Sequence, residues 1–98
     1  MRIIAPRTLR SFWESGHADS EGALRAWLAE AQVASWGSMA DIKVHYPGAS
    51  IIDSERVVFN IRGNNYRLFG KVWFPGRMVF IKFIGTHAAY DRLDVTQL

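Results

Sequence analysis

The sequence predicts an α+β fold in which two N-terminal helices pack on a small, twisted, mainly antiparallel sheet with a C-terminal three-strand meander. Apolar residues recur at helical spacing over the first third of the chain, which predicts the helices. Farther along, runs rich in Val, Ile, Phe, Tyr and Trp are separated by two dipeptides typical of tight turns, Gly63-Asn64 and Pro75-Gly76. A length of 98 residues suits one hydrophobic core, so we expect a single domain over residues 1–98.

The composition is that of a globular protein, with 49% hydrophobic and 21% charged residues. Cysteine is absent, which excludes disulfides and thiolate metal sites. No apolar run approaches the length that spans a membrane, and Ile3-Ile4-Ala5 is too short for the apolar region of a signal peptide. We therefore expect a cytoplasmic protein with no membrane partner.

The first third of the chain predicts a short strand followed by two helices. Residues 2–5 favour the strand, and Pro6 suits the first turn of a helix, where its missing N–H needs no partner. Residues 7–15 predict the first helix, whose apolar side chains are Leu9, Phe12 and Trp13. Residues 21–35 predict the second helix, whose apolar stripe is expected to face the sheet and consists of Leu24, Trp27, Leu28, Ala31 and Ala34.

The middle of the chain is less regular. Residues 39–46 fit either a short helix or an extended segment, and residues 49–55 cross to the meander. Residues 56–87 hold its three strands. Gly85 is expected to end the third strand, and Thr86 is expected to cap a short helical turn that follows.

Positive charge is concentrated in the meander. Residues 56–87 contain six basic residues and no Asp or Glu, whereas the whole chain has a formal charge of +3. Only three of the 12 basic residues are lysine, and the planar guanidinium of arginine suits bidentate recognition of phosphate. A basic surface of this kind predicts a polyanionic partner. The alternative is that half of these arginines lie along sheet edges and serve solubility.

Side chains alternate across a strand, so the middle strand divides into two faces. Its apolar face, expected in the core, holds Tyr66, Leu68, Gly70, Val72 and Phe74. Its other face interleaves cations with aromatic rings and holds Asn65, Arg67, Phe69, Lys71 and Trp73. Such a surface is typical of RNA binding, because cations neutralise phosphates and rings stack on bases. Two alternatives stay open: Asp91, Asp94 or a helix carboxylate pairs with the cations, or Phe69 and Trp73 form a second small core.

The neighbouring strands are expected to add polar groups to this second face. In the third strand, Val79, Ile81 and Phe83 alternate with Phe80, Lys82 and Ile84, which places Lys82 beside Arg67 and Lys71. In the first strand, Asn60 and Arg62 share a face with Val58.

His87 is the strongest candidate for proton transfer. An imidazole changes its charge near neutral pH, and this one directly follows the end of a strand. In a helical turn, His87, Tyr90 and Asp91 fall on one face, so the Asp91 carboxylate is placed to orient the imidazole. The alternative is that His87 is an ordinary surface or capping residue. The other histidines, His17 and His45, lie in turn-like stretches without a metal-ligand spacing, so we expect no metal site.

Several of these stretches together resemble the HigB branch of the RelE-type toxins, the toxin halves of bacterial toxin–antitoxin pairs. The residues that carry the resemblance are Arg56–Ile61, Gly63–Leu68, Phe80–His87 and Tyr90-Asp91, with Ala40–Lys43 in addition. The resemblance implies a small α/β fold with N-terminal helices on a twisted antiparallel sheet. It also implies an mRNA interferase that cuts messenger RNA, typically during translation on the ribosome. A helix-turn-helix antitoxin is implied as partner, and operator DNA is bound only through the toxin–antitoxin complex.

The resemblance also suggests roles for individual residues. The expected reaction is attack of the ribose 2′-hydroxyl on the adjacent phosphate, which requires no cofactor. The catalytic candidates are Arg67, Lys71, His87, Tyr90 and Asp91. The candidates for binding RNA beside the cut are Arg62, Asn64, Arg77 and Lys82. Gly70 stands where the family strand has an aliphatic residue, which indicates a bulge that would change the facing of Lys71 and Trp73.

Two other functions use the same basic face. One is a non-catalytic module that inhibits translation by occupying RNA or the ribosome, for which His87 would be dispensable. The other is a protein-interaction domain whose basic face binds an acidic partner.

Overall fold

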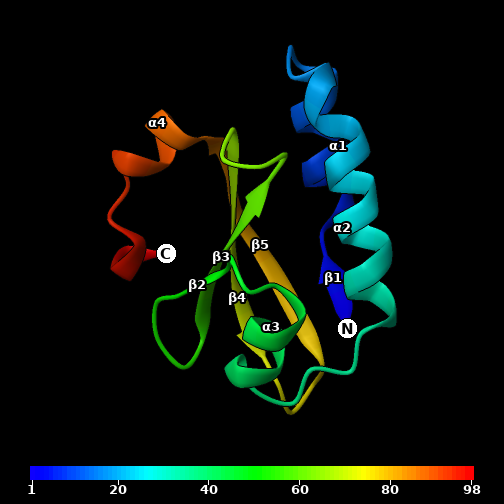
Figure 1. Ribbon diagram of the computed structural model, residues 1–98, viewed down its shortest axis with the longest axis vertical. Helices are drawn as coiled ribbons and strands as arrows, with labels where there is room; N and C mark the ends of the chain where they lie inside the picture. Colours follow the sequence, from blue (N-terminus) through cyan, green and yellow to red (C-terminus); the bar gives the residue numbers. More distant parts are fainter.

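A five-stranded mixed sheet forms the centre of the computed structural model, which describes residues 1–98 (Figure 1). The strands are β1 (Arg2–Ile4), β2 (Ser50–Ile51), β3 (Arg56–Ile61), β4 (Tyr66–Trp73) and β5 (Met78–Thr86), and their order across the sheet is β1-β5-β4-β3-β2. Strands β3, β4 and β5 are the predicted antiparallel meander. The predicted leading strand β1 pairs with β5 in parallel, which makes the sheet mixed.

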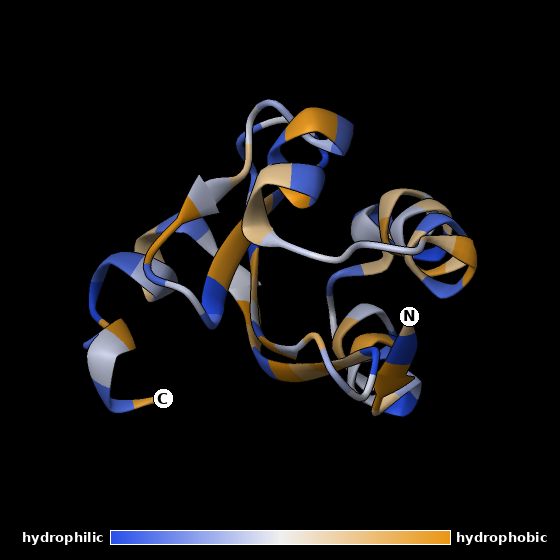
Figure 2. Cartoon of the chain, turned by 90° about the horizontal axis from the view of Figure 1, so that it is seen from below, coloured by the Kyte–Doolittle hydropathy of each residue, from blue (hydrophilic) through white to orange (hydrophobic).

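Helices cover one face of the sheet, and the C-terminal segment covers part of the other. The helices are α1 (Pro6–Glu14), α2 (Glu21–Val33), α3 (Met39–His45) and α4 (His87–Asp91), with 3-10 turns at η1 (Ala18–Ser20) and η2 (Val95–Gln97). Figure 1 shows α1 and α2 on one side of the strands and α4 on the other, and the view from below in Figure 2 keeps the same separation.

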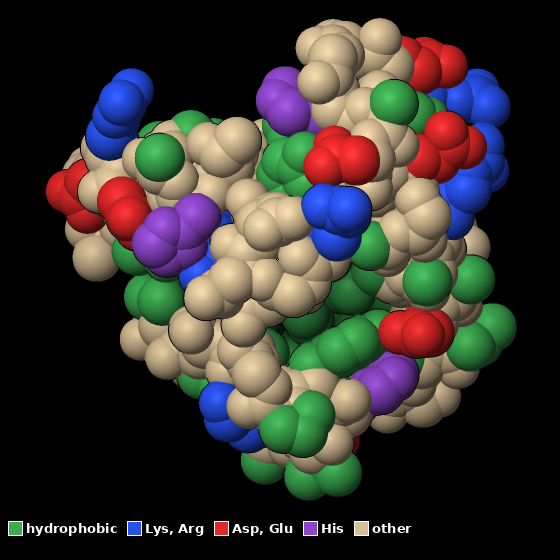
Figure 3. Space-filling model, turned by 45° about the horizontal axis from the view of Figure 1, so that its top comes forward, with side chains coloured by type: hydrophobic (Ala, Val, Ile, Leu, Met, Phe, Trp, Pro, Cys, Tyr) green, Lys and Arg blue, Asp and Glu red, His purple; other side chains and the backbone are tan.

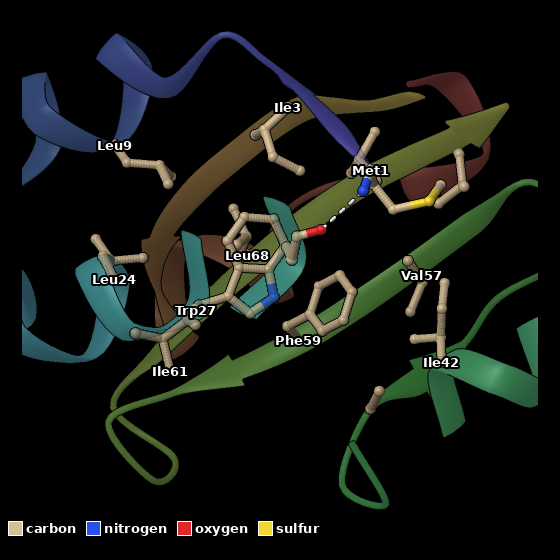
Figure 4. Packing of buried hydrophobic residues seen from close by; sticks show 14 of the residues in the cluster. Met1, Ile3, Leu9, Leu24, Trp27, Ile42, Val57, Phe59, Ile61 and Leu68 are labelled. Carbon is tan, nitrogen blue, oxygen red and sulfur yellow. Dashed lines mark hydrogen bonds between the residues drawn. The ribbon is translucent and has the colours of Figure 1, made fainter. Parts of the chain in front are cut away.

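The main core lies between the helices and the sheet. The predicted stripe of α2 contributes Leu24, Trp27 and Ala31, each at most 3% exposed. These residues belong to one buried cluster with side chains of β3 and β4, including Phe59 and Leu68 (Figure 4). Phe59 contacts three aromatic rings, those of Trp27, Trp36 and Tyr46. This packing gives the meander a rigid backing, so the strands that carry the side chains of the opposite face have a fixed backbone.

The opposite face of the meander contains a second, smaller apolar group. Val58, Phe69 and Phe83 are direct neighbours across the three strands. Phe69 is completely buried, and the Phe83 ring lies 6.5 Å from the ring of Tyr90 in α4. The second small core is therefore present beneath the C-terminal segment. Trp73 is not part of it, because its side chain is 55% exposed.

The structure settles one open point about the elements of the chain and corrects two expectations about its strands. Residues 39–46 form the helix α3, whose N-cap Ser38 accepts a hydrogen bond from the Asp41 N–H. Within the crossing segment 49–55, Ser50–Ile51 forms an edge strand that was not predicted. The expectation that Gly85 ends the third strand was wrong, because Gly85 pairs with Arg67 inside the sheet.

A bulge at the centre of the sheet changes the facing of β5. Phe69 pairs with Phe83 and Gly70 pairs with Ile81, so Lys82 has no partner on β4. The extra residue moves Phe83 to the face of Phe69, while Ile84 packs against the main core. The strict alternation expected for β5 was therefore wrong beyond Ile81. A bulge does lie opposite Gly70, but β4 itself alternates without interruption.

Candidate active site

Arg67 is a nearly buried cation at the end of β4 that adjoins α4. Its side chain is only 9% exposed, and no carboxylate lies within 4.0 Å of it. Its guanidinium donates hydrogen bonds to the backbone oxygen of Asn64 at 3.2 Å, to Asn64 Oδ1 at 3.0 Å and to the Tyr66 oxygen at 3.3 Å. These three neutral acceptors fix the guanidinium and leave its charge uncompensated, which is a favourable arrangement for binding an anion.

The turn that supplies these acceptors is fastened to the helical layer. Tyr66 donates a hydrogen bond to Asp19 Oδ1 of η1 at 2.5 Å, and this bond raises the pKa of the Tyr66 phenol above its ordinary value. Arg62 reaches the other oxygen of the same carboxylate at 3.3 Å. Arg62 has a φ of 51° and belongs to the turn, so its predicted place on the face of Val58 was wrong. Arg62 holds the turn in place and is itself neutralised.

Helix α4 brings the predicted histidine group to the same end of the sheet. Thr86 caps the helix as expected, because its hydroxyl accepts the Ala89 N–H at 3.1 Å. The His87 N–H donates to the Asn65 oxygen at 3.3 Å, which ties the start of α4 to the turn that holds Arg67. His87 Nδ1 lies 3.3 Å from Asp91 Oδ2, as the helical spacing predicted. Both side chains are about half exposed, with Nε2 as the remaining nitrogen of the imidazole.

Tyr90 connects α4 with Arg67. Burial raises the pKa of the Tyr90 phenol, the Asp91 carboxylate acts in the same direction, and the nearby Arg67 guanidinium opposes both. The phenol is therefore protonated at neutral pH and is able to donate a proton. Figure 3 brings this end of the molecule forward and shows a histidine beside acidic side chains, with a basic side chain recessed next to them.

The two lysines lie farther along the same face. Lys71 follows Arg67 by four residues on β4, about 13 Å at the rise of a strand. Its Nζ lies 3.6 Å from Glu55 Oε2, so a carboxylate does pair with this cation, but it is neither Asp91, Asp94 nor a helix residue, as the alternative had it. Lys82 projects from the bulge, is exposed and has no carboxylate within 4.0 Å. Lys71 and Lys82 line the same shallow depression. They are therefore placed to bind neighbouring parts of a ligand that starts at Arg67.

Arg77 lies apart from the other candidates. It belongs to the turn between β4 and β5, with a φ of 55°, at the end of the sheet opposite α4. Its oxygen accepts the Arg2 N–H at 2.7 Å, which places it beside β1. The structure thus brings Arg67, Asn64, His87, Tyr90 and Asp91 together, places Lys71 and Lys82 farther along the same face, and leaves Arg62 and Arg77 outside.

Sequence reasoning missed two acidic residues that shape this surface. Glu55 pairs with Lys71, and Asp19 pairs with Arg62. Glu55 directly precedes β3, so a register that places Arg56 opposite Lys71 would have indicated the first pair. No signal in the sequence connects Asp19 with the distant turn.

The cap of α4 is expected to determine how firmly His87 is held. Replacing Thr86 with Ala removes the hydroxyl that accepts the Ala89 N–H, and such caps contribute about 0.5–2 kcal/mol. Amide hydrogen exchange of α4 in the folded protein should accelerate by roughly 2- to 30-fold. Thr86→Ser keeps the oxygen and should exchange like the wild type. Unchanged exchange in Thr86→Ala would show that the cap is dispensable.

The structure contains no group of three or more His, Cys, Asp or Glu side chains close enough to hold a metal ion. None of its helices has the length and apolar character needed to cross a membrane. A family model described as HigB_toxin, the RelE-like toxic component of a toxin-antitoxin system, matches residues 20–93. The match runs from the end of η1 to just beyond α4 and includes the whole candidate site. No curated protein matches the sequence.

Proposed function

Because the chain belongs to the HigB family of RelE-like toxins, which act in toxin–antitoxin systems, we propose that it is an endoribonuclease that cleaves messenger RNA. The observation that carries this proposal is the Arg67 guanidinium, which is nearly buried, fixed by three neutral acceptors and free of any carboxylate. A phosphate that gains charge during a reaction is stabilised best by a cation already held in position.

The proposed reaction uses the RNA itself as the nucleophile. The ribose 2′-oxygen bonds to the adjacent phosphorus, and the bond from phosphorus to the 5′-oxygen of the next nucleotide breaks. The products are a 2′,3′-cyclic phosphate and a 5′-hydroxyl. One proton leaves the 2′-hydroxyl and one joins the departing 5′-oxygen, so the protein has to supply a base, an acid and a cation.

His87, Asp91 and Tyr90 are the proposed proton carriers. With Nδ1 of His87 directed at the Asp91 carboxylate, the lone pair of the neutral imidazole lies on Nε2. Nε2 is therefore the proposed base for the 2′-hydroxyl, and Asp91 stabilises the imidazolium that forms. Tyr90 is a phenol at neutral pH because burial raises its pKa, although the nearby Arg67 guanidinium lowers it, so Tyr90 is the proposed acid for the 5′-oxygen. Lys71 and Lys82 are proposed to bind the phosphates that follow.

The family implies an antitoxin partner. We propose that this antitoxin has a helix-turn-helix domain, that the complex binds operator DNA through it, and that the protein cleaves messages in the cytoplasm, typically during translation on the ribosome. A small adjacent reading frame with a helix-turn-helix pattern would support the pairing.

The proposed function is tested by inducing the protein alone and mapping RNA ends, with and without an inhibitor of translation. Cleavage predicts downstream fragments whose new 5′ ends carry a hydroxyl, matched by upstream fragments whose 3′ ends carry a 2′,3′-cyclic phosphate. Loss of these ends when translation is blocked would assign the reaction to the ribosome. Growth arrest without new RNA ends would overturn the nuclease and favour inhibition by occupancy.

Asn64→Asp tests whether the uncompensated charge of Arg67 matters. The substitution keeps the shape of the side chain but places a carboxylate about 3 Å from the guanidinium, where Oδ1 now accepts at 3.0 Å. We expect RNA binding to weaken by roughly tenfold, the equivalent of about 1.4 kcal/mol, without loss of thermal stability. Asn64→Ala serves as the control because it leaves Arg67 uncompensated. Equal RNA affinity of the wild type and Asn64→Asp would contradict the role of the charge.

A further inference from the structure

A shallow, solvent-open depression lies on the face of Arg67, toward the opposite end of the sheet. Its volume is about 330 Å³, and its lining residues are Glu55, Lys71, Val72, Trp73, Phe80 and Lys82. It combines two ammonium groups and two aromatic rings with one carboxylate. Because Glu55 pairs with Lys71, the uncompensated charge of the depression is that of Lys82.

Trp73 is the exceptional tryptophan of this protein. Its side chain is 55% exposed, whereas Trp13, Trp27 and Trp36 are at most 7% exposed. An exposed indole offers a ligand a large, flat apolar surface, and this one lines the depression together with Lys71 and Lys82. The proposed cleavage chemistry at Arg67 and α4 does not use it.

The indole of Trp73 is held in place by the turn that follows β4. A Cβ atom added to Gly76 would lie 2.3 Å from the indole Cε3 and Cζ3 atoms, so the ring packs directly against this glycine. The backbone of Gly76 is not left-handed, so its conformation does not require glycine. Glycine is needed here because any side chain would collide with the Trp73 ring. The exposed indole is therefore a fixed surface. A ring that is already ordered loses little conformational entropy when a base stacks on it.

The bulge places a cation in the same depression as the Trp73 ring. Lys82 is the extra residue of β5, and its Nζ lies 5.9 Å from the centre of the Phe80 ring. A fixed aromatic ring with an unpaired cation beside it is the pairing that binds single-stranded nucleic acid, because the base stacks and the phosphate is neutralised. A negatively charged RNA strand also matches the positive charge of Lys82 in the depression better than a neutral apolar peptide does.

From this geometry we infer that Trp73 stacks on a base of the same RNA strand that is cut at Arg67, and that Lys82 binds a phosphate next to that base. This inference rests on the proposed function and extends it to substrate binding away from the cut. Trp73 follows Arg67 by six residues on β4, about 20 Å at the rise of a strand. Roughly six nucleotides at the stacked spacing of about 3.4 Å cover that distance, and fewer suffice if the strand is extended.

Tryptophan fluorescence tests this inference without any cleavage. The probe is a ten-nucleotide RNA with 2′-O-methyl groups, which cannot react, titrated into the full-length protein. Because the other three tryptophans are buried, quenching that saturates reports Trp73. Trp73→Phe should lose the quenching and still bind the RNA with similar affinity. An RNA that binds, measured by its own label, without changing the Trp73 emission would overturn the inference.

Two variants test whether Trp73 contributes to the binding of RNA that is then cleaved. Trp73→Ala should raise the KM for a ten-nucleotide RNA by roughly 5- to 150-fold, the range for loss of one stacked base, with kcat little changed. Gly76→Ala displaces the indole without altering any charge and should raise the KM in the same direction. For a dinucleotide, which is too short to reach Trp73, both variants should equal the wild type. If the KM for the dinucleotide rises as much as the KM for the ten-nucleotide RNA, the variants have a structural defect and the inference is contradicted.

The outcomes separate the subsite from the cleavage reaction. Quenching by the uncleavable RNA in a protein that cuts no RNA would overturn the nuclease and keep Trp73 as an RNA contact. If the protein cleaves RNA, the uncleavable RNA causes no quenching and Trp73→Ala has an unchanged KM, the nuclease is kept and Trp73 is not an RNA contact. If purified antitoxin shifts the emission of Trp73 and RNA does not, the ring is a protein contact and the inference is wrong.

Discussion

Replacing Arg67 with Ala is expected to lower the rate of RNA cleavage by about 10²–10³-fold and to abolish growth arrest. The guanidinium is the one nearly buried cation of the proposed site, and three hydrogen bonds hold it before substrate arrives. Its loss removes charge stabilisation that water cannot fully replace, because water dipoles must reorient as the charge develops whereas the guanidinium is already in position. Cleavage of a labelled RNA by purified protein under single-turnover conditions measures the effect.

Two further variants make this result interpretable. Arg67→Lys keeps the charge but not the planar fork, so it should fold and retain intermediate activity. Arg10→Ala removes an exposed cation of α1 that pairs with Glu14 at 3.9 Å, and it should cleave like the wild type. Circular dichroism and the melting temperature establish that Arg67→Ala is folded. A folded Arg67→Ala that cuts RNA at the wild-type rate would remove Arg67 from the mechanism.

Replacing His87 with Ala is expected to lower cleavage by about 10²–10⁴-fold, the usual contribution of a general base or acid. The side chain is 51% exposed, so the fold should not depend on it. Asp91→Asn keeps the shape of the carboxylate and removes its charge, and a smaller loss of activity is expected because it acts only through the imidazole. The readout is cleavage rate together with RNA affinity, since affinity should change little.

This variant also separates the enzyme from a non-catalytic inhibitor. If the protein acts by occupying RNA or the ribosome, His87→Ala should still arrest growth, and no new RNA ends should appear with either protein. Full cleavage activity in His87→Ala would instead transfer the proton-carrying role to Tyr90 or Asp91.

The sequence predicted the meander, the two N-terminal helices and the α4 turn because each depends on local features. Gly63-Asn64 and Pro75-Gly76 are turn signals, and the spacing of His87 and Asp91 by itself brings imidazole and carboxylate together once a helical turn forms. The resemblance to the HigB toxins added the fold and the toxin role, which the family match confirms.

What could not be predicted depends on contacts between distant residues. The bulge at Lys82 arises from the pairing of β4 with β5, and it exchanges the faces of Phe83 and Ile84. The ion pair of Arg62 with Asp19 joins a turn to a distant 3-10 helix. Strand periodicity contains no information on the bulge or on this ion pair. The periodicity therefore placed Arg62 on the basic face, although it lies in the turn. The catalytic roles of the residues at the site remain predictions.

The parallel pairing of β1 with β5 affects the order in which the parts of the sheet form as the chain is synthesised. Arg2–Ile4 is translated well before its partner strand, which begins at Met78. Closing a loop of nearly the whole chain is slow, so we expect this edge of the sheet to form last. His87 also follows β5 in the chain. The completed sheet and α4, which together position Arg67 and His87, therefore form only after the region from Arg2 to Asp91 has been translated.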